Sequence, residues 1–77
     1  MKTINVGILG MGTVGSGVVK LLQDHSALLD RRVGARLRIR KIAEIGTLRM
    51  PVDPKLLSTD AIEVINDPQV DIVVELI

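Results

Sequence analysis

The chain has 77 residues, with 10 basic and 9 acidic side chains and a formal net charge of +1. It contains no cysteine and one histidine. This composition excludes disulfides, thiolate zinc sites and multi-histidine metal clusters, and it favours a reducing cytoplasm. The charge is balanced, no aromatic ring is present to stack on bases, and the apolar runs are far shorter than the about 20 residues of a membrane helix. We therefore expect neither a nucleic acid nor a membrane as partner.

The first expected element is a buried strand over Ile4–Leu9, because this stretch is short, apolar and rich in β-branched residues. From Thr13 the apolar residues recur at helical spacing, which predicts a helix up to about His25. Ser26 is the expected N-cap of a second, short helix that reaches Arg32.

The second expected strand is Arg36–Ala43, in which apolar and charged residues alternate, so that one of its faces is only half-buried. Glu44–Lys55 contains a glycine, two prolines and no clean period, which predicts a loop. Asp60 is the expected N-cap of a short helix over Ala61–Asn66, with Glu63 as its capping-box partner.

A third strand is expected over Ile72–Leu76. The resulting order, β-α-β-α-β, favours a parallel α/β sheet with right-handed crossovers. Because the chain stops on a strand, we expect residues 1–77 to be the N-terminal part of a larger domain. A substrate and catalytic domain is then expected outside this chain.

The strongest motif is a G-x-G-x-x-G pattern, Gly10-Met11-Gly12-Thr13-Val14-Gly15, between the first strand and the first helix. This is the context that a dinucleotide-binding turn of a Rossmann-type sheet requires. Gly10 would make the tight turn, Gly12 would let a diphosphate approach the backbone, and Gly15 would let the helix pack closely on the strand. The N–H groups at the start of the helix would then face the phosphates. The alternative is a plain glycine-rich turn.

Glu44 follows the second strand, where a dinucleotide site needs an acceptor for the adenosine ribose. We hypothesise that it accepts hydrogen bonds from both ribose hydroxyls and favours NAD over NADP by repelling a 2′-phosphate. The alternative is a solvated loop carboxylate. Arg49 could instead meet a 2′-phosphate, so the cofactor is expected to be NAD or NADP.

Three further features are weaker candidates. His25 is interpreted as a solvated helix residue, and Glu75 either lines a cofactor crevice or contacts a covering helix. The basic residues cluster in the second expected helix and the second expected strand, which indicates a solvated face or a contact with further chain. This cluster consists of Arg31, Arg32, Arg36, Arg38, Arg40 and Lys41. We assign no catalytic residue and no metal ligand to the chain.

The opening segment, residues 6–19 (VGILGMGTVGSGVV), and the closing segment, residues 64–77 (VINDPQVDIVVELI), resemble homoserine dehydrogenase. The middle of the chain is similar too, where RIRKIA at residues 38–43 enters the second strand. The resemblance spans essentially the whole chain, and its closing segment is far more specific than the glycine pattern. It implies an oxidoreductase that reduces aspartate 4-semialdehyde to homoserine with NADH or NADPH, in threonine and methionine biosynthesis.

By the same resemblance, Gly10, Gly12 and Gly15 hold the diphosphate, and Thr13 and Val14 add backbone contacts. Glu44 matches a position where many members place an acidic residue or another cofactor-selecting group. The small-molecule substrate would be bound only in the full-length enzyme, so the chain alone is expected to be inactive.

Two other interpretations remain at the level of the sequence. One is another semialdehyde or amino-acid dehydrogenase with the same first half. The other is a non-catalytic nucleotide-binding or ligand-sensing module. In each case a half-fold would leave apolar sheet surface and strand edges uncovered, so we expect self-association into a homo-oligomer or marginal stability.

Overall fold

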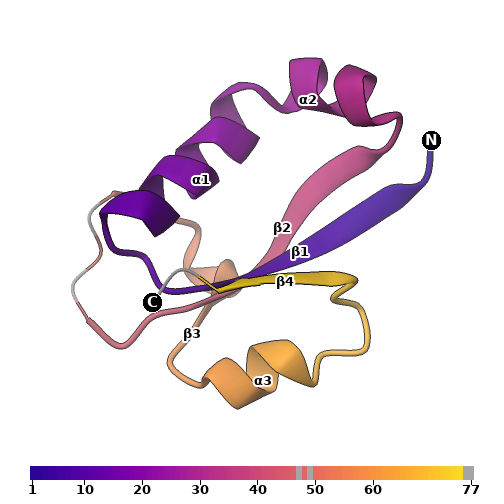
Figure 1. Ribbon diagram of the computed structural model, residues 1–77. Helices are drawn as coiled ribbons and strands as arrows, with labels where there is room; N and C mark the ends of the chain where they lie inside the picture. The colour runs from indigo at the N-terminus through magenta and orange to yellow at the C-terminus, as the bar shows by residue number, and fades with distance from the viewer. Residues whose placement is uncertain (47, 49, 76–77) are drawn as a thin grey trace.

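A computed structural model describes residues 1–46, 48 and 50–75, with the backbone only at residue 13. Strands and helices alternate along the chain (Figure 1). In chain order the elements are β1 (Thr3–Leu9), α1 (Thr13–Asp24), α2 (Ser26–Val33), β2 (Arg36–Ala43), the 3-10 helix η1 (Pro54–Leu56), β3 (Leu57–Ser58), α3 (Ala61–Ile65) and β4 (Ile72–Glu75).

The strands form one parallel sheet in the order β3-β2-β1-β4. Helices α1 and α2 cover one face of this sheet, and α3 covers the other face (Figure 1). This arrangement confirms the predicted parallel α/β fold. The predicted first and second strands are observed, and β4 begins at Ile72 as predicted. The predicted end of that strand, Leu76, lies outside the described residues.

The sheet has a fourth strand that the sequence did not predict. β3 is only two residues long, and it follows η1 directly. Its Leu57 and Ser58 are in register with Ile42 and Ala43 of β2. A strand of this length has no periodicity to recognise, so it is defined by its pairing partner and not by its own residues.

The helical region between β1 and β2 breaks where it was predicted to break. His25 ends α1 and also precedes α2, and no side-chain hydrogen bond caps α2. The prediction that Ser26 caps the second helix is therefore wrong, since Ser26 is already its first residue. α2 ends at Gly34, which adopts the left-handed conformation at φ 79° and donates its N–H to the carbonyl of Asp30 at 2.8 Å.

Helix α3 begins at the predicted cap. The Oδ1 atom of Asp60 accepts a hydrogen bond from the N–H of Ile62 at 2.9 Å. The predicted capping box is wrong, because the N–H of Asp60 donates to the Oγ of Ser58 at 3.1 Å. Glu63 is used elsewhere, as its Oε1 lies 3.2 Å from the Nζ of Lys41 on β2.

The core lies on both faces of β1, whose residues Val6–Leu9 are all buried. This confirms the expectation of a strand covered on both sides. Towards α1, the buried cluster consists of Val6, Ile8, Met11, Val19 and Ile42. Towards α3, a smaller buried cluster consists of Leu9, Ala43 and Val64. The charged residues of β2 alternate with less exposed ones, also as predicted.

Candidate functional site

The glycine turn lies at the carboxyl end of β1, where the chain leaves the sheet and enters α1. Gly10 has φ 99°, a left-handed conformation that disfavours any side chain. Its N–H donates to the carbonyl of Ala43, at the end of β2, at 2.9 Å. The predicted role of Gly10 as the residue of the tight turn therefore fits the observed backbone.

The start of α1 is uncapped among the described residues. Gly12 is the N-cap, and it makes no side-chain cap hydrogen bond. The carbonyl of Gly12 accepts the N–H of Ser16 at 2.9 Å. By helix geometry the N–H groups of Thr13, Val14 and Gly15 precede this first helical hydrogen bond and have no acceptor within the helix. They lie at the positive end of the helix dipole, which attracts anions.

Gly12 faces open space. A Cβ atom built on this residue would meet nothing within 4 Å, so the absence of a side chain is not required for packing. The opening next to it is a cavity of about 410 Å³. The cavity is lined by Leu9, Gly10, Gly12, Ala43, Glu44, Ile45, Thr59 and Ala61. It therefore lies at the carboxyl ends of β1 and β2, the edge at which open α/β sheets bind ligands.

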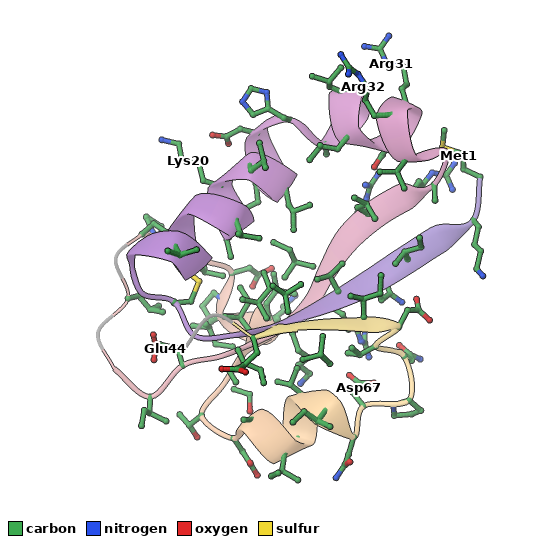
Figure 2. All side chains as sticks on the ribbon, in the orientation of Figure 1. Met1, Lys20, Arg31, Arg32, Glu44 and Asp67 are labelled. Atoms are coloured by element: carbon green, nitrogen blue, oxygen red, sulfur yellow. The ribbon has the colours of Figure 1, made fainter. Side chains whose placement is uncertain are left out.

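Glu44 forms the acidic part of this cavity. Figure 2 places it at the end of the sheet opposite Met1. Its Oε1 accepts the N–H of Met11 at 2.8 Å, and its Oε2 accepts the N–H groups of Ile45 at 3.0 Å and Gly46 at 3.2 Å. The half-buried side chain is thus held by the protein backbone at the cavity, and its contact with a ribose stays a prediction. Arg49, the other residue considered for cofactor selection, lies outside the described residues.

The sequence did not single out the apolar wall of the cavity. Ile45 is 84% exposed although it is large and apolar, and it lines the cavity with Thr59 and Ala61. The position of Ile45 directly after Glu44 was a usable signal, since both follow the end of β2. Thr59 and Ala61 could not be found in this way. Both follow the unpredicted strand β3, whose pairing with β2 brings this part of the chain to the cavity.

The basic cluster lies away from the cavity. Arg31 and Arg32 are at the C-terminal end of α2, far from Glu44 (Figure 2). Half of the cluster is paired with acidic residues: Arg38 with Asp30 at 3.0 Å, Arg40 with Asp67 at 3.4 Å and Lys41 with Glu63 at 3.2 Å. The other two weak candidates, His25 and Glu75, are exposed and do not line the cavity.

No group of three or more His, Cys, Asp and Glu side chains in the described part of the chain could hold a metal ion. None of the helices in that part is both long enough and apolar enough to cross a membrane.

Strand order β3-β2-β1-β4, with a glycine turn leading from the central strand into the first helix, defines a Rossmann-type α/β fold. The chain matches the N-terminal region of homoserine dehydrogenases. It is 48% identical over its whole length to the homoserine dehydrogenase of Bacillus subtilis and 41% identical, over 99% of its length, to that of Corynebacterium glutamicum. It spans only 18% of each of these relatives. No family model matches the chain.

Solved structures give the same result. A crystal structure of S. aureus homoserine dehydrogenase at pH 6.0 superimposes on 97% of the chain with a TM-score of 0.81 and 34% identity. The chain covers 20% of that protein. The same protein at pH 7.5 matches with a TM-score of 0.81 and 33% identity. The comparisons therefore confirm the resemblance to homoserine dehydrogenase and do not favour a non-catalytic sensing module.

Proposed function

We propose that the chain is the cofactor-binding segment of a homoserine dehydrogenase, which interconverts aspartate 4-semialdehyde and homoserine in threonine and methionine biosynthesis. The cofactor is NAD or NADP, and when bound it supplies the hydride chemistry. One observation supports this function above all: the uncapped start of α1 opens on a cavity whose other wall contains the carboxylate of Glu44.

The diphosphate is held by backbone N–H groups at the start of α1, from Thr13, Val14 and Gly15. Gly12 supports this role because its missing side chain leaves space and serves no packing contact. The adenosine half occupies the cavity, where Glu44 accepts from the ribose and Ile45 contributes apolar surface. Each of these groups lies at the same edge of the sheet, so one extended ligand can contact them together.

Residues 1–77 form the N-terminal part of the dinucleotide-binding domain in this proposal. Hydride transfer needs cofactor and substrate to be held together at a short distance. We assign no substrate-binding or catalytic residue to this chain, so it binds the dinucleotide but does not react alone. The complete enzyme is then a cytoplasmic homo-oligomer.

The first experiment measures binding of ADP and NADH to the chain by calorimetry. Gly12→Ala places a methyl group in the open space beside the diphosphate and should weaken both ligands at least about tenfold. Gly17→Ala is the matched control, since Gly17 is exposed within α1 and a Cβ there also meets nothing within 4 Å. Equal affinities for the two variants would contradict the proposed diphosphate site.

The second experiment tests the enzyme activity. In a chimera, the chain replaces the matching N-terminal segment of the Bacillus subtilis homoserine dehydrogenase, to which it is 48% identical. Homoserine should drive the appearance of NADH or NADPH absorbance, and at subsaturating cofactor Gly12→Ala should slow it at least about tenfold while Gly17→Ala retains the rate. A folded chimera that reduces neither cofactor would count against the function.

The alternative non-catalytic module predicts a different ligand preference. A mononucleotide sensor would bind AMP tightly and gain nothing from the nicotinamide half. The proposed function instead predicts that NADH and ADP bind more tightly than AMP, because AMP lacks the second phosphate that faces the start of α1. Calorimetry with the three ligands separates the two functions.

A further inference from the structure

Glu44 joins two loops that are far apart in the chain. Its Oε1 accepts the N–H of Met11, within the glycine turn, at 2.8 Å. Its Oε2 accepts the N–H groups of Ile45 and Gly46, in the segment that follows β2. A single carboxylate therefore fixes the turn after β1 relative to the end of β2. Hydrogen bonds from backbone N–H groups to a carboxylate are about twice as strong as neutral ones.

The peptide at Met11 is the part of the turn that most needs such a tether. Glycines flank it on both sides, and glycine restrains the backbone least of all residues. Below the turn, the Met11 side chain is fully buried in the core, and the Met11 carbonyl accepts the Oγ of Ser16 at 3.0 Å. The bond from the Met11 N–H to Glu44 completes this set of anchors and fixes the direction in which the next residues enter α1.

We propose that Glu44 is a positioning residue for the glycine turn, and that it strengthens diphosphate binding through Met11 independently of any contact with the ribose. This inference rests on the proposed dinucleotide function. Its consequence is specific: Glu44 contributes to the binding of ligands that lack ribose hydroxyls altogether.

The test compares ADP with 2′,3′-dideoxy-ADP, which has the same diphosphate but neither ribose hydroxyl. If Glu44 positions the turn, Glu44→Ala should weaken the dideoxy ligand about tenfold, which corresponds to one charge-assisted hydrogen bond. Glu44→Gln should lose less, because its amide oxygen can still accept the Met11 N–H. If Glu44 acts only on the ribose, both variants will bind the dideoxy ligand as tightly as the wild type, and the proposal is overturned.

Charge needs a control, because removing any carboxylate makes the protein more attractive to anions. Asp24→Ala removes the same charge from an exposed residue at the C-terminal end of α1, opposite the glycine turn. It should leave the affinity for the dideoxy ligand unchanged or slightly increased. A loss in Asp24→Ala equal to the loss in Glu44→Ala would overturn the positioning role.

A second measurement needs no ligand. Hydrogen exchange of the Met11 amide should accelerate at least about tenfold in Glu44→Ala. The Gly10 amide, which donates to the carbonyl of Ala43, should change little. Unchanged Met11 exchange would overturn the inference even if ADP binds normally. Conversely, a wild-type chain that fails to bind ADP would overturn the proposed function, while the exchange measurement would still decide whether Glu44 holds the turn.

Discussion

Gly7 of β1 lies directly under Val64 of α3, so close that a Cβ atom on Gly7 would be 2.6 Å from the Cγ1 of Val64. The same atom would lie 3.2 Å from the Cγ1 of Val70. Val64 is fully buried, and it belongs to the small cluster that fills the α3 side of the sheet. The contact between α3 and the central strand therefore depends on the absence of a side chain at Gly7.

Gly7→Ala should consequently destabilise the fold. Real Cβ atoms essentially never approach another atom this closely, so the buried Val64 side chain or the helix that carries it must shift. Overpacking of this kind lowers the free energy of unfolding by about 1–3 kcal/mol. Urea unfolding followed by circular dichroism measures the loss.

The control for Gly7→Ala is Gly17→Ala, in the exposed part of α1. Alanine is the better helix former, so this variant should gain about 0.5–1 kcal/mol. If Gly7→Ala were as stable as Gly17→Ala, the packing of α3 on β1 would be looser than the structure has it.

Asp30 connects the end of α2 to the start of β2. Its Oδ1 accepts the N–H of Leu37 at 3.0 Å, and its Oδ2 lies 3.0 Å from the guanidinium of Arg38. The hydrogen bond from Arg38, followed by that from Leu37, lowers the pKa of Asp30 below its ordinary value of 3.8. Asp67 behaves in the same way, and its pKa is lowered first by the hydrogen bond from the N–H of Gln69.

Stability should therefore fall on acidification. A carboxyl group whose pKa is lower in the folded state stabilises the fold fully above its unfolded pKa, and this contribution disappears as the pH falls through the folded pKa. We expect the free energy of unfolding to decrease from about pH 4 downwards. In Asp30→Asn the decrease should be smaller, because one of the two groups no longer titrates. Urea titrations of both proteins between about pH 7 and about pH 3 check this, and parallel curves would contradict the role of Asp30.

Elements that depend on neighbouring residues in the sequence could be predicted, whereas contacts between residues far apart in the sequence could not. β1, β2 and the break between α1 and α2 follow from local patterns of apolar residues, and they were predicted nearly to the residue. Ser26 and Glu63 were misassigned, because each fits a capping motif locally but the real bonds depend on neighbours in space. Glu63, for example, is paired with Lys41 of β2.

The same limit applies to the candidate site. The glycine turn is local in sequence, and the positive φ of Gly10 agrees with its predicted role. Close packing of a helix on β1 was predicted at Gly15, and the structure shows a further close approach at Gly7, where α3 returns from a distant part of the chain. The bond from Met11 to Glu44 joins residues 33 positions apart, so no spacing rule could reveal it.

Cofactor selection gives a further prediction at Glu44. A 2′-phosphate carries a charge of about −1.5 to −2 and would lie next to this carboxylate, so the wild type should bind NAD more tightly than NADP. In Glu44→Ala the ratio of the two affinities should move towards NADP by about tenfold. Any effect of the glycine turn on the diphosphate is common to both cofactors and cancels in the ratio. An unchanged ratio would remove Glu44 from cofactor selection without affecting its role at Met11.

The exposed edge of β4 predicts self-association of the chain. β4 is at the end of the described sheet and pairs with β1 alone. Its Ile72 is 48% exposed and its Val73 is 39% exposed, although both are large and apolar. An uncovered strand edge with apolar side chains is a template for a second copy of the same strand. Sedimentation should therefore show association that increases with concentration, and the melting temperature should rise with concentration.

A lysine on the edge strand distinguishes association through β4 from nonspecific association through other exposed apolar surface. Val73→Lys introduces a charge at the strand edge and should return the chain to a monomer, because charged edge residues oppose strand pairing. Ile62→Lys is the matched control: Ile62 is 60% exposed on α3, away from the edge, and its replacement should leave the association intact. If both variants weakened association equally, the apolar surface as a whole would be responsible. A wild-type melt that is cooperative and independent of concentration would exclude association through β4 altogether.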